Sequence, residues 1–217
     1  MSTAVEVEGG ALVWETGAER ARLGGFSHGA SGVGWALART AGVLGDEAIA
    51  DAAVRALRFD DALFDPSRRR WRDARPEARS AAGSFPAHWC HGTAGIAMAR
   101  ADAAATLDRP DLLELALVGA RETASDTLPS DDSLCHGTLG NLIAVRGATR
   151  RTGVDPGLED YRDRALQRVL RAGPRSGLPE GVTSVRGLML GTSGALYALC
   201  RELEPGIPDA LLLEGPR

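Results

Sequence analysis

Cysteine and histidine side chains are gathered in one short sequence signature that recurs along the chain. All four histidines lie in or beside it, and two of the three cysteines, Cys90 and Cys135, each precede a His-Gly pair. Three copies carry histidine and read GFSHGASG from Gly25, HWCHGTAG from His88 and LCHGTLG from Leu134; a fourth, without histidine, reads GLMLGTSG from Gly187. Thiolates and imidazoles together are the ligands that zinc prefers. These residue types therefore predict a metal site before any fold is considered.

The number of metal ligands is limited by how the side chains can point. The available donors form two adjacent pairs and two single histidines, namely Cys90 with His91, Cys135 with His136, His28 and His88. The sequence has no Cys-x-x-Cys, which disfavours a zinc finger or ribbon. Adjacent residues at the start of a helix point in different directions, so the two pairs are not expected to donate all four side chains. We therefore expect three protein ligands and an exchangeable fourth position, as in catalytic zinc sites.

The signature also organises the chain into repeats. Each copy contains a Gly-x-x-Gly turn followed by an apolar helical stretch, and the turns begin at Gly29, Gly92, Gly137 and Gly191, at intervals of 63, 45 and 54 residues. Periods of this size indicate repeated helical units. The apolar stretches cover 33–38, 96–105, 142–148 and 195–203, and further helices are expected at 46–57, 111–124 and 158–171. The pattern predicts an all-α fold of helical hairpins, with glycines that supply positive φ angles or close backbone approach at the turns.

Size and charge limit the class of protein. The chain has 217 residues, 44% of them hydrophobic, which fits a single domain over 1–217, with 1–23 as an irregular N-terminal segment. A net charge of −4 argues against a nucleic-acid partner. No run of eighteen apolar residues predicts a membrane span, and no signal peptide is evident at the start. Three cysteines in such a chain favour a reducing, cytoplasmic location.

The motifs, in this order, resemble the cyclase domain of lanthipeptide synthetases, and most of all the C-terminal cyclase part of the bifunctional class II enzymes. The likeness runs from about Gly24 to the C-terminus and includes FDPSRRRW before the second copy and LLLEGPR at the end. It implies an α/α toroid of helical hairpins joined by Gly-x-x-Gly turns, of which this chain holds only the C-terminal half. An incomplete ring leaves apolar helix faces uncovered, so we expect a homo-oligomer or a partner that supplies the missing N-terminal half.

The resemblance also implies a site and a reaction. Zinc is expected to be held by Cys90, Cys135 and His136, while His28 matches the active-site histidine and His91 shapes the site without binding metal. The implied reaction adds cysteine thiols of a precursor peptide to dehydroalanine or dehydrobutyrine residues, which forms thioether rings. Zinc would activate the thiol, and His28 would transfer a proton. The precursor peptide would have to be dehydrated first by a separate dehydratase.

Two other functions remain open at this point. The same thiol chemistry would serve a relative that adds glutathione to dehydrated residues, and a catalytically inactive, zinc-stabilised protein could act as a peptide-binding scaffold. A metal-free, glycan-processing helical barrel is disfavoured, because it needs a pair of catalytic carboxylates. The nearest pair is Asp131-Asp132, which we interpret as a helix cap or a solvated turn.

Overall fold

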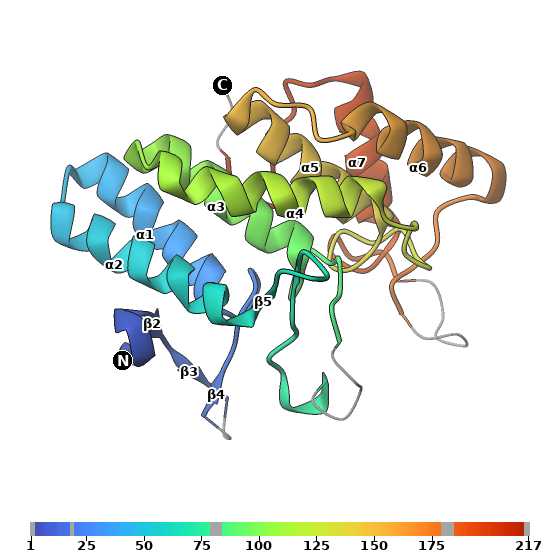
Figure 1. Ribbon diagram of the computed structural model, residues 1–217. Coiled ribbons are helices and arrows are strands. Elements are labelled where there is room, and N and C mark those ends of the chain that lie inside the picture. The colour runs from blue at the N-terminus through green and yellow to red at the C-terminus, as the bar shows by residue number, and fades with distance from the viewer. Residues whose placement is uncertain (1–2, 18–19, 79–83, 179–184, 215–217) are drawn as a thin grey trace.

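Helical hairpins laid side by side form the molecule, as predicted (Figure 1). The computed structural model describes residues 3–17, 20–78, 84–178 and 185–214. Within these ranges it contains seven α-helices: α1 (Ala30–Leu44), α2 (Glu47–Phe59), α3 (Thr93–Leu107), α4 (Leu113–Ser125), α5 (Thr138–Thr152), α6 (Leu158–Ala172) and α7 (Thr192–Leu203). Each of the seven predicted helical stretches falls on one of these helices. None of the described helices is long and apolar enough to cross a membrane.

The helices form two layers that follow an arc. In the inner layer, α3 packs against both α1 and α5, and α5 also contacts α7; in the outer layer, α2, α4 and α6 each pack on the inner helix that precedes them. Helix α3 is buried on all sides, since every residue from 93 to 104 is buried. Outer helix α6 instead buries one stripe at helical spacing, formed by Leu158, Tyr161, Ala165 and Val169. The apolar core therefore lies between the layers.

Short antiparallel strand pairs accompany the helices. The N-terminal segment, where irregular structure was expected, contains β1 (Val5–Glu6) paired with β2 (Leu12–Val13), and β3 (Glu15–Thr16) paired with β4 (Ala21–Arg22). A third pair, β5 (Phe64–Asp65) with β6 (Arg70–Trp71), lies in the long connection that precedes α3. Each strand has only two residues, too few to produce an alternating pattern in the sequence.

The β5–β6 pair anchors that connection to the helices. Trp71 is fully buried, and its ring lies 4.9 Å from that of Phe64. On the helix side, Arg69 and Arg70 form ion pairs of 2.8 and 2.9 Å with Glu122 and Asp126 near the end of α4. The β5–β6 pair is therefore attached to the outer layer. Residues 79–83 of this connection lie outside the described residues.

The glycines of the recurring turns are required by close backbone approach. The cap glycines that precede the inner helices have extended φ angles between −102° and −137°, so positive φ is not the reason for glycine there. The second glycine of each turn lies in the first helical turn, where an added Cβ would come within 1.9 Å of a carbonyl oxygen six residues earlier, at Gly32, Gly95, Gly140 and Gly194. Of the two reasons predicted for these glycines, close approach is the one observed.

Candidate metal centre

Equivalent positions of the four turns are joined by backbone hydrogen bonds. The amide of Ser27 donates to the carbonyl of Cys90 at 2.9 Å, the amide of Cys90 donates to Cys135 at 3.1 Å, and the amide of Cys135 donates to Met189 at 3.0 Å. Each of these residues lies two positions before the cap glycine of an inner helix. This hydrogen-bond relay places Cys90 beside Cys135, although they are far apart in sequence.

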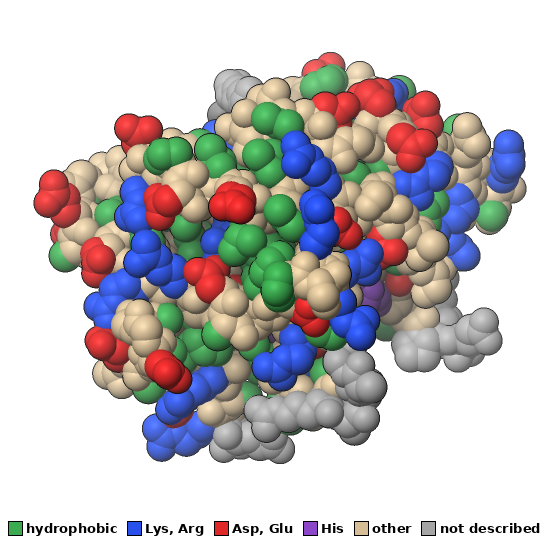
Figure 2. All heavy atoms as spheres, viewed as in Figure 1, with side chains coloured by type: hydrophobic (Ala, Val, Ile, Leu, Met, Phe, Trp, Pro, Cys, Tyr) green, Lys and Arg blue, Asp and Glu red, His purple; other side chains and the backbone are tan. Residues whose placement is uncertain are grey.

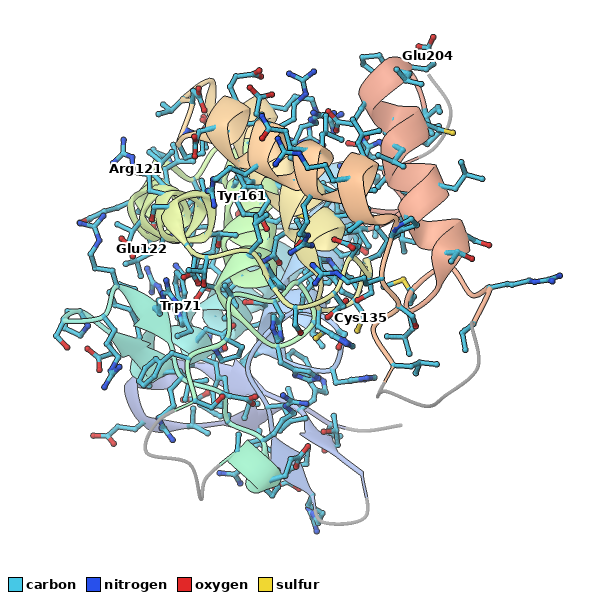
Figure 3. The ribbon with its side chains drawn as sticks, turned by 90° about the vertical axis from the view of Figure 1, so that its right-hand side faces the viewer. Trp71, Arg121, Glu122, Cys135, Tyr161 and Glu204 are labelled. Carbon is cyan, nitrogen blue, oxygen red and sulfur yellow. The ribbon has the colours of Figure 1, made fainter. Side chains whose placement is uncertain are left out.

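Three of the predicted ligands converge at this point. The sulfur atoms of Cys90 and Cys135 and one ring nitrogen of His136 all lie within 4.8 Å of one another. Three ligands of one ion need separations on this scale, because each donor lies about 2.0–2.3 Å from the metal. Cys90 is buried, whereas Cys135 and His136 are partly exposed, so the group has one accessible side. Figure 3 shows Cys135 among the loops below the helices.

The surroundings of His136 suit a metal ligand. Its Nε2 lies 2.9 Å from the carbonyl oxygen of Gly177, so Nε2–H donates to that oxygen and the other ring nitrogen is available for an ion. Metal-binding histidines in proteins are commonly oriented by a carbonyl or carboxylate partner of this kind. The donor set and the orientation of the ring therefore both fit a zinc ion.

The pKa values of Cys90, Cys135 and His136 are shifted by their contacts with one another. The hydrogen bond from Cys90 lowers the pKa of the Cys135 thiol to about 5, an effect that burial opposes and that His136 reinforces. The same hydrogen bond and burial raise the pKa of Cys90, while the contact with Cys135 raises the pKa of His136. Metal ligands must give up their protons, so donors that lie in hydrogen-bond contact with one another are suited to hold a cation in place of those protons.

His28 and His91 belong to the first and second turns, which the hydrogen bond from Ser27 to Cys90 joins. Their rings stack with centroids 5.5 Å apart, and Nε2 of His91 lies 3.5 Å from the hydroxyl oxygen of Ser27. His91 is buried, and burial, followed by the positive charge of Arg75, lowers its pKa. His28 is exposed. Among the described residues, neither histidine belongs to the three-ligand group; His91 stacks on exposed His28 and follows the candidate ligand Cys90 in the sequence.

Comparison with known proteins identifies the fold family. The family model described as "Lanthionine synthetase C-like protein" matches residues 14–212. This chain belongs to that family. Its structure is also similar to that of the protein titled "Nisin cyclase", with a TM-score of 0.68 and 20% sequence identity, over 85% of this chain and 47% of that one. The chain thus spans about half the length of that protein, and its hairpins form part of an α/α toroid, as expected.

A cavity of about 720 Å³ adjoins the candidate metal centre of this lanthionine synthetase C-like chain at His136. Its lining includes His88, Asp131, His136, Arg175, Ser176 and Leu178. The His88 ring lies 5.8 Å from that of His136, and burial, followed by the positive charge of His136, lowers the pKa of His88. On the face drawn in Figure 2, histidine side chains are visible in a small recess. His88, which the sequence offered only as one of the available donors, therefore forms part of the wall beside the candidate ligand His136.

Several charged residues at the centre were not predicted from the sequence. Asp73 is buried and accepts a bidentate pair of hydrogen bonds from Arg75. Nε donates to Oδ1 at 3.1 Å, and Nη2 donates to Oδ2 at 2.6 Å. Burial opposes these hydrogen bonds, but the pKa of Asp73 is lowered overall. The positive charge of Arg75 acts on both Cys90 and His91. The only available sequence signal was an Asp-Ala-Arg triplet in a connection.

The interpretation of Asp131-Asp132 as a helix cap or solvated turn was wrong for Asp132. That side chain is buried and forms an ion pair with Arg168 of α6. Its neighbour Asp131 lies 3.8 Å from Nε2 of His136 and lines the cavity. Because both residues closely precede the Leu-Cys-His-Gly motif, their position in the sequence could have indicated a supporting role at the metal centre.

Proposed function

We propose that this chain is the metal-bearing part of a zinc-dependent lanthipeptide cyclase. The observation that carries the proposal is the convergence of Cys90, Cys135 and His136 in a chain of the lanthionine synthetase C-like family. The resemblance noted in the sequence, to the cyclase part of class II synthetases, agrees with this assignment. The catalysed reaction is an intramolecular addition of cysteine thiols to dehydroalanine or dehydrobutyrine, and the products are thioether rings.

Zinc bound by these three residues would lower the pKa of a substrate thiol and so keep it in the reactive thiolate form. The thiolate sulfur then forms a bond to the β-carbon of the dehydrated residue, and the electron pair of the double bond moves toward the neighbouring carbonyl. The α-carbon must finally receive a proton. The role of the protein is to hold the thiol and the acceptor together and to manage the two protons.

His28 is our candidate for proton transfer. Its side chain is exposed, and its ring stacks on the ring of buried His91, which follows Cys90 in the sequence. Exposure allows the imidazole to reach a peptide, and stacking limits the orientations it adopts. We assign His91 to shaping the site, and we assign the cavity beside His136 to the substrate peptide.

The proposed partners follow from the reaction and from the surface. The substrate is a dehydrated precursor peptide, and a separate dehydratase in the same cytoplasm has to produce it. Three leucine side chains on and near α7 are exposed, which supports contact with a second protein surface. Their exposed fractions are 43% for Leu188, 64% for Leu196 and 88% for Leu203. We propose that the missing half of the ring, or a second copy of this chain, covers them.

The test combines metal analysis with a thiol assay. Protein purified without chelators should contain about one zinc per chain. Incubation with a dehydrated, cysteine-containing peptide should remove free thiols from that peptide, measured by alkylation, without changing its mass, because an addition within one molecule loses no atoms. The assay is run on the chain alone and together with the missing half of a related cyclase. The Cys200→Ser variant serves as a control, because Cys200 lies on α7, outside the ligand group.

Each other result has a defined meaning. Absence of zinc from freshly prepared protein would remove the central claim. If glutathione is supplied and the peptide gains its mass, the protein is a glutathione-adding relative. Zinc with no thiol loss, even when the missing half is present, would identify a zinc-stabilised peptide-binding scaffold.

A further inference from the structure

The loop that carries Cys135 and His136 is held by an arginine of the outer layer. Arg168 of α6 donates to the carbonyl oxygens of Pro129 at 2.6 Å and of Asp131 at 3.2 Å, and also to the side chains of Asp132 and Thr138. Only 20% of its side chain is exposed. The four acceptors lie on both sides of the two metal ligands in the sequence, so this one guanidinium fixes both ends of the ligand loop, residues 129–138.

Asp132 joins the ligand loop to a second segment, residues 175–177. One carboxylate oxygen pairs with Arg168, and the other accepts the backbone amide of Arg175 at 2.9 Å. The amide of Asp132 donates in turn to the carbonyl of Arg175, also at 2.9 Å. The Asp132 side chain is completely buried. The Arg175 side chain lies 3.5 Å from the same oxygen that accepts its amide. A buried carboxylate with partners on both oxygens makes a rigid connection, because losing any of these contacts weakens the compensation of a buried charge.

The second segment holds His136 from the opposite side. The carbonyl of Gly177 accepts the hydrogen bond from Nε2 of His136, and the amide of Gly177 donates to the carbonyl of Leu190 at 2.9 Å. There is no room here for a side chain, because a Cβ on Gly177 would lie 2.8 Å from Nε2 of His136 and 2.7 Å from the Ser133 hydroxyl. The orientation of the His136 ring therefore depends on where Gly177 lies relative to the ligand loop.

We propose that Asp132 is a positioning residue for the metal centre, which clamps the ligand loop to residues 175–177 and thereby orients the imidazole of His136. This inference rests on metal binding by Cys90, Cys135 and His136, as in the proposed function. It does not depend on the identity of the peptide substrate. It assigns a function to a buried ion pair that no part of the proposed chemistry uses directly.

The experiment measures zinc affinity by competition with a chromophoric chelator, on metal-depleted, reduced protein. Asp132→Asn and Gly177→Ala should each weaken zinc binding by about 10- to 100-fold, the usual effect of removing a group that orients a ligand. The cobalt-substituted forms should show altered absorption spectra, because the ligand geometry changes. Gly177→Ala leaves the Asp132–Arg168 pair in place and so tests the orientation of the ring directly. If Asp132→Asn alone does not fold, the double variant Asp132→Asn/Arg168→Gln replaces it, since it leaves no buried charge unpaired.

Matched controls separate positioning from general stability. Asp209 is buried like Asp132 and pairs with Arg201 at 2.9 Å, but it accepts amides of the C-terminal segment. A Cβ on Gly147 of α5 would lie 3.4 Å from the nearest atom, on Met98, which is ordinary contact. Asp209→Asn and Gly147→Ala should therefore bind zinc like the unaltered chain. Unchanged affinity in Gly177→Ala or the Asp132 variant, or an equal loss in Asp209→Asn, would overturn the inference. An unaltered chain that binds zinc but forms no rings, even when the missing half is present, would refute the proposed function and leave this inference standing.

Discussion

Replacing Cys135 by serine should remove the stabilisation that zinc gives to this chain. The ligands come from the turns before α3 and α5, so a bound ion links two hairpins of the arc. Any ligand that binds only the folded state stabilises it by an amount set by its concentration relative to Kd. At zinc 100-fold above Kd the gain is about 2.7 kcal/mol, and a variant whose Kd is 100-fold higher retains only about 0.4 kcal/mol.

The difference corresponds to a measurable shift in melting temperature. For a chain of this size, 1 kcal/mol changes Tm by about 2–4 °C, so the zinc-dependent rise in Tm should be about 5–9 °C smaller in Cys135→Ser. Without metal the two proteins should melt at similar temperatures, because serine has nearly the shape of cysteine and Cys135 is only partly buried.

The rise in Tm is measured by calorimetry or by fluorescence-monitored melting, with and without zinc, under reducing conditions. Cys200→Ser is the matched control: it removes another partly buried free cysteine, which is not in the ligand group, and should keep the full rise in Tm. If zinc raised the Tm of Cys135→Ser as much as that of the unaltered chain, the ion would not be held by this group and the reasoning would fail.

Two further variants test other parts of the structure. His28→Ala should retain zinc but slow ring formation by about 10²-fold or more, because proton transfer is lost; an unchanged rate in the thiol assay would place the acid elsewhere. Asp60 is completely buried, and burial raises its pKa to about 7 against the hydrogen bond from Ser31. Because the folded state holds this proton more tightly than the unfolded state does, Asp60 stabilises the fold at low pH, and that contribution declines as pH rises from about 4 to about 7. Asp60→Asn should make stability, measured by urea unfolding at pH 5 and pH 8, less dependent on pH in this range; an unchanged difference would contradict this assignment.

The sequence predicted the helices well and singled out three side chains that do converge, because helices leave a periodic signal and clustered Cys and His residues a compositional one. The stretches 96–105 and 142–148 lie inside α3 and α5, and the Cys-His-Gly motifs mark the turns before them. The β5–β6 pair and the partners of Asp132 could not be predicted, since they depend on where distant segments meet. Likewise, the sequence did not decide why glycine is needed at the turns, whether for a positive φ angle or for close approach of the backbone. Only the packing of each turn against its own helix decides that question.

The hydrogen-bond relay through Ser27, Cys90, Cys135 and Met189 acts mechanically as a hub from which the inner helices fan out. A rotation of about 5° between neighbouring hairpins, pivoting at the hub, would move the far end of a 15-residue helix such as α3 by roughly 2 Å. Atoms at the pivot would move only a small fraction of that distance. An open arc can therefore flex at its rim while the separations among Cys90, Cys135 and His136 stay nearly constant. Under such a rotation the candidate ligands would move less than the helix ends.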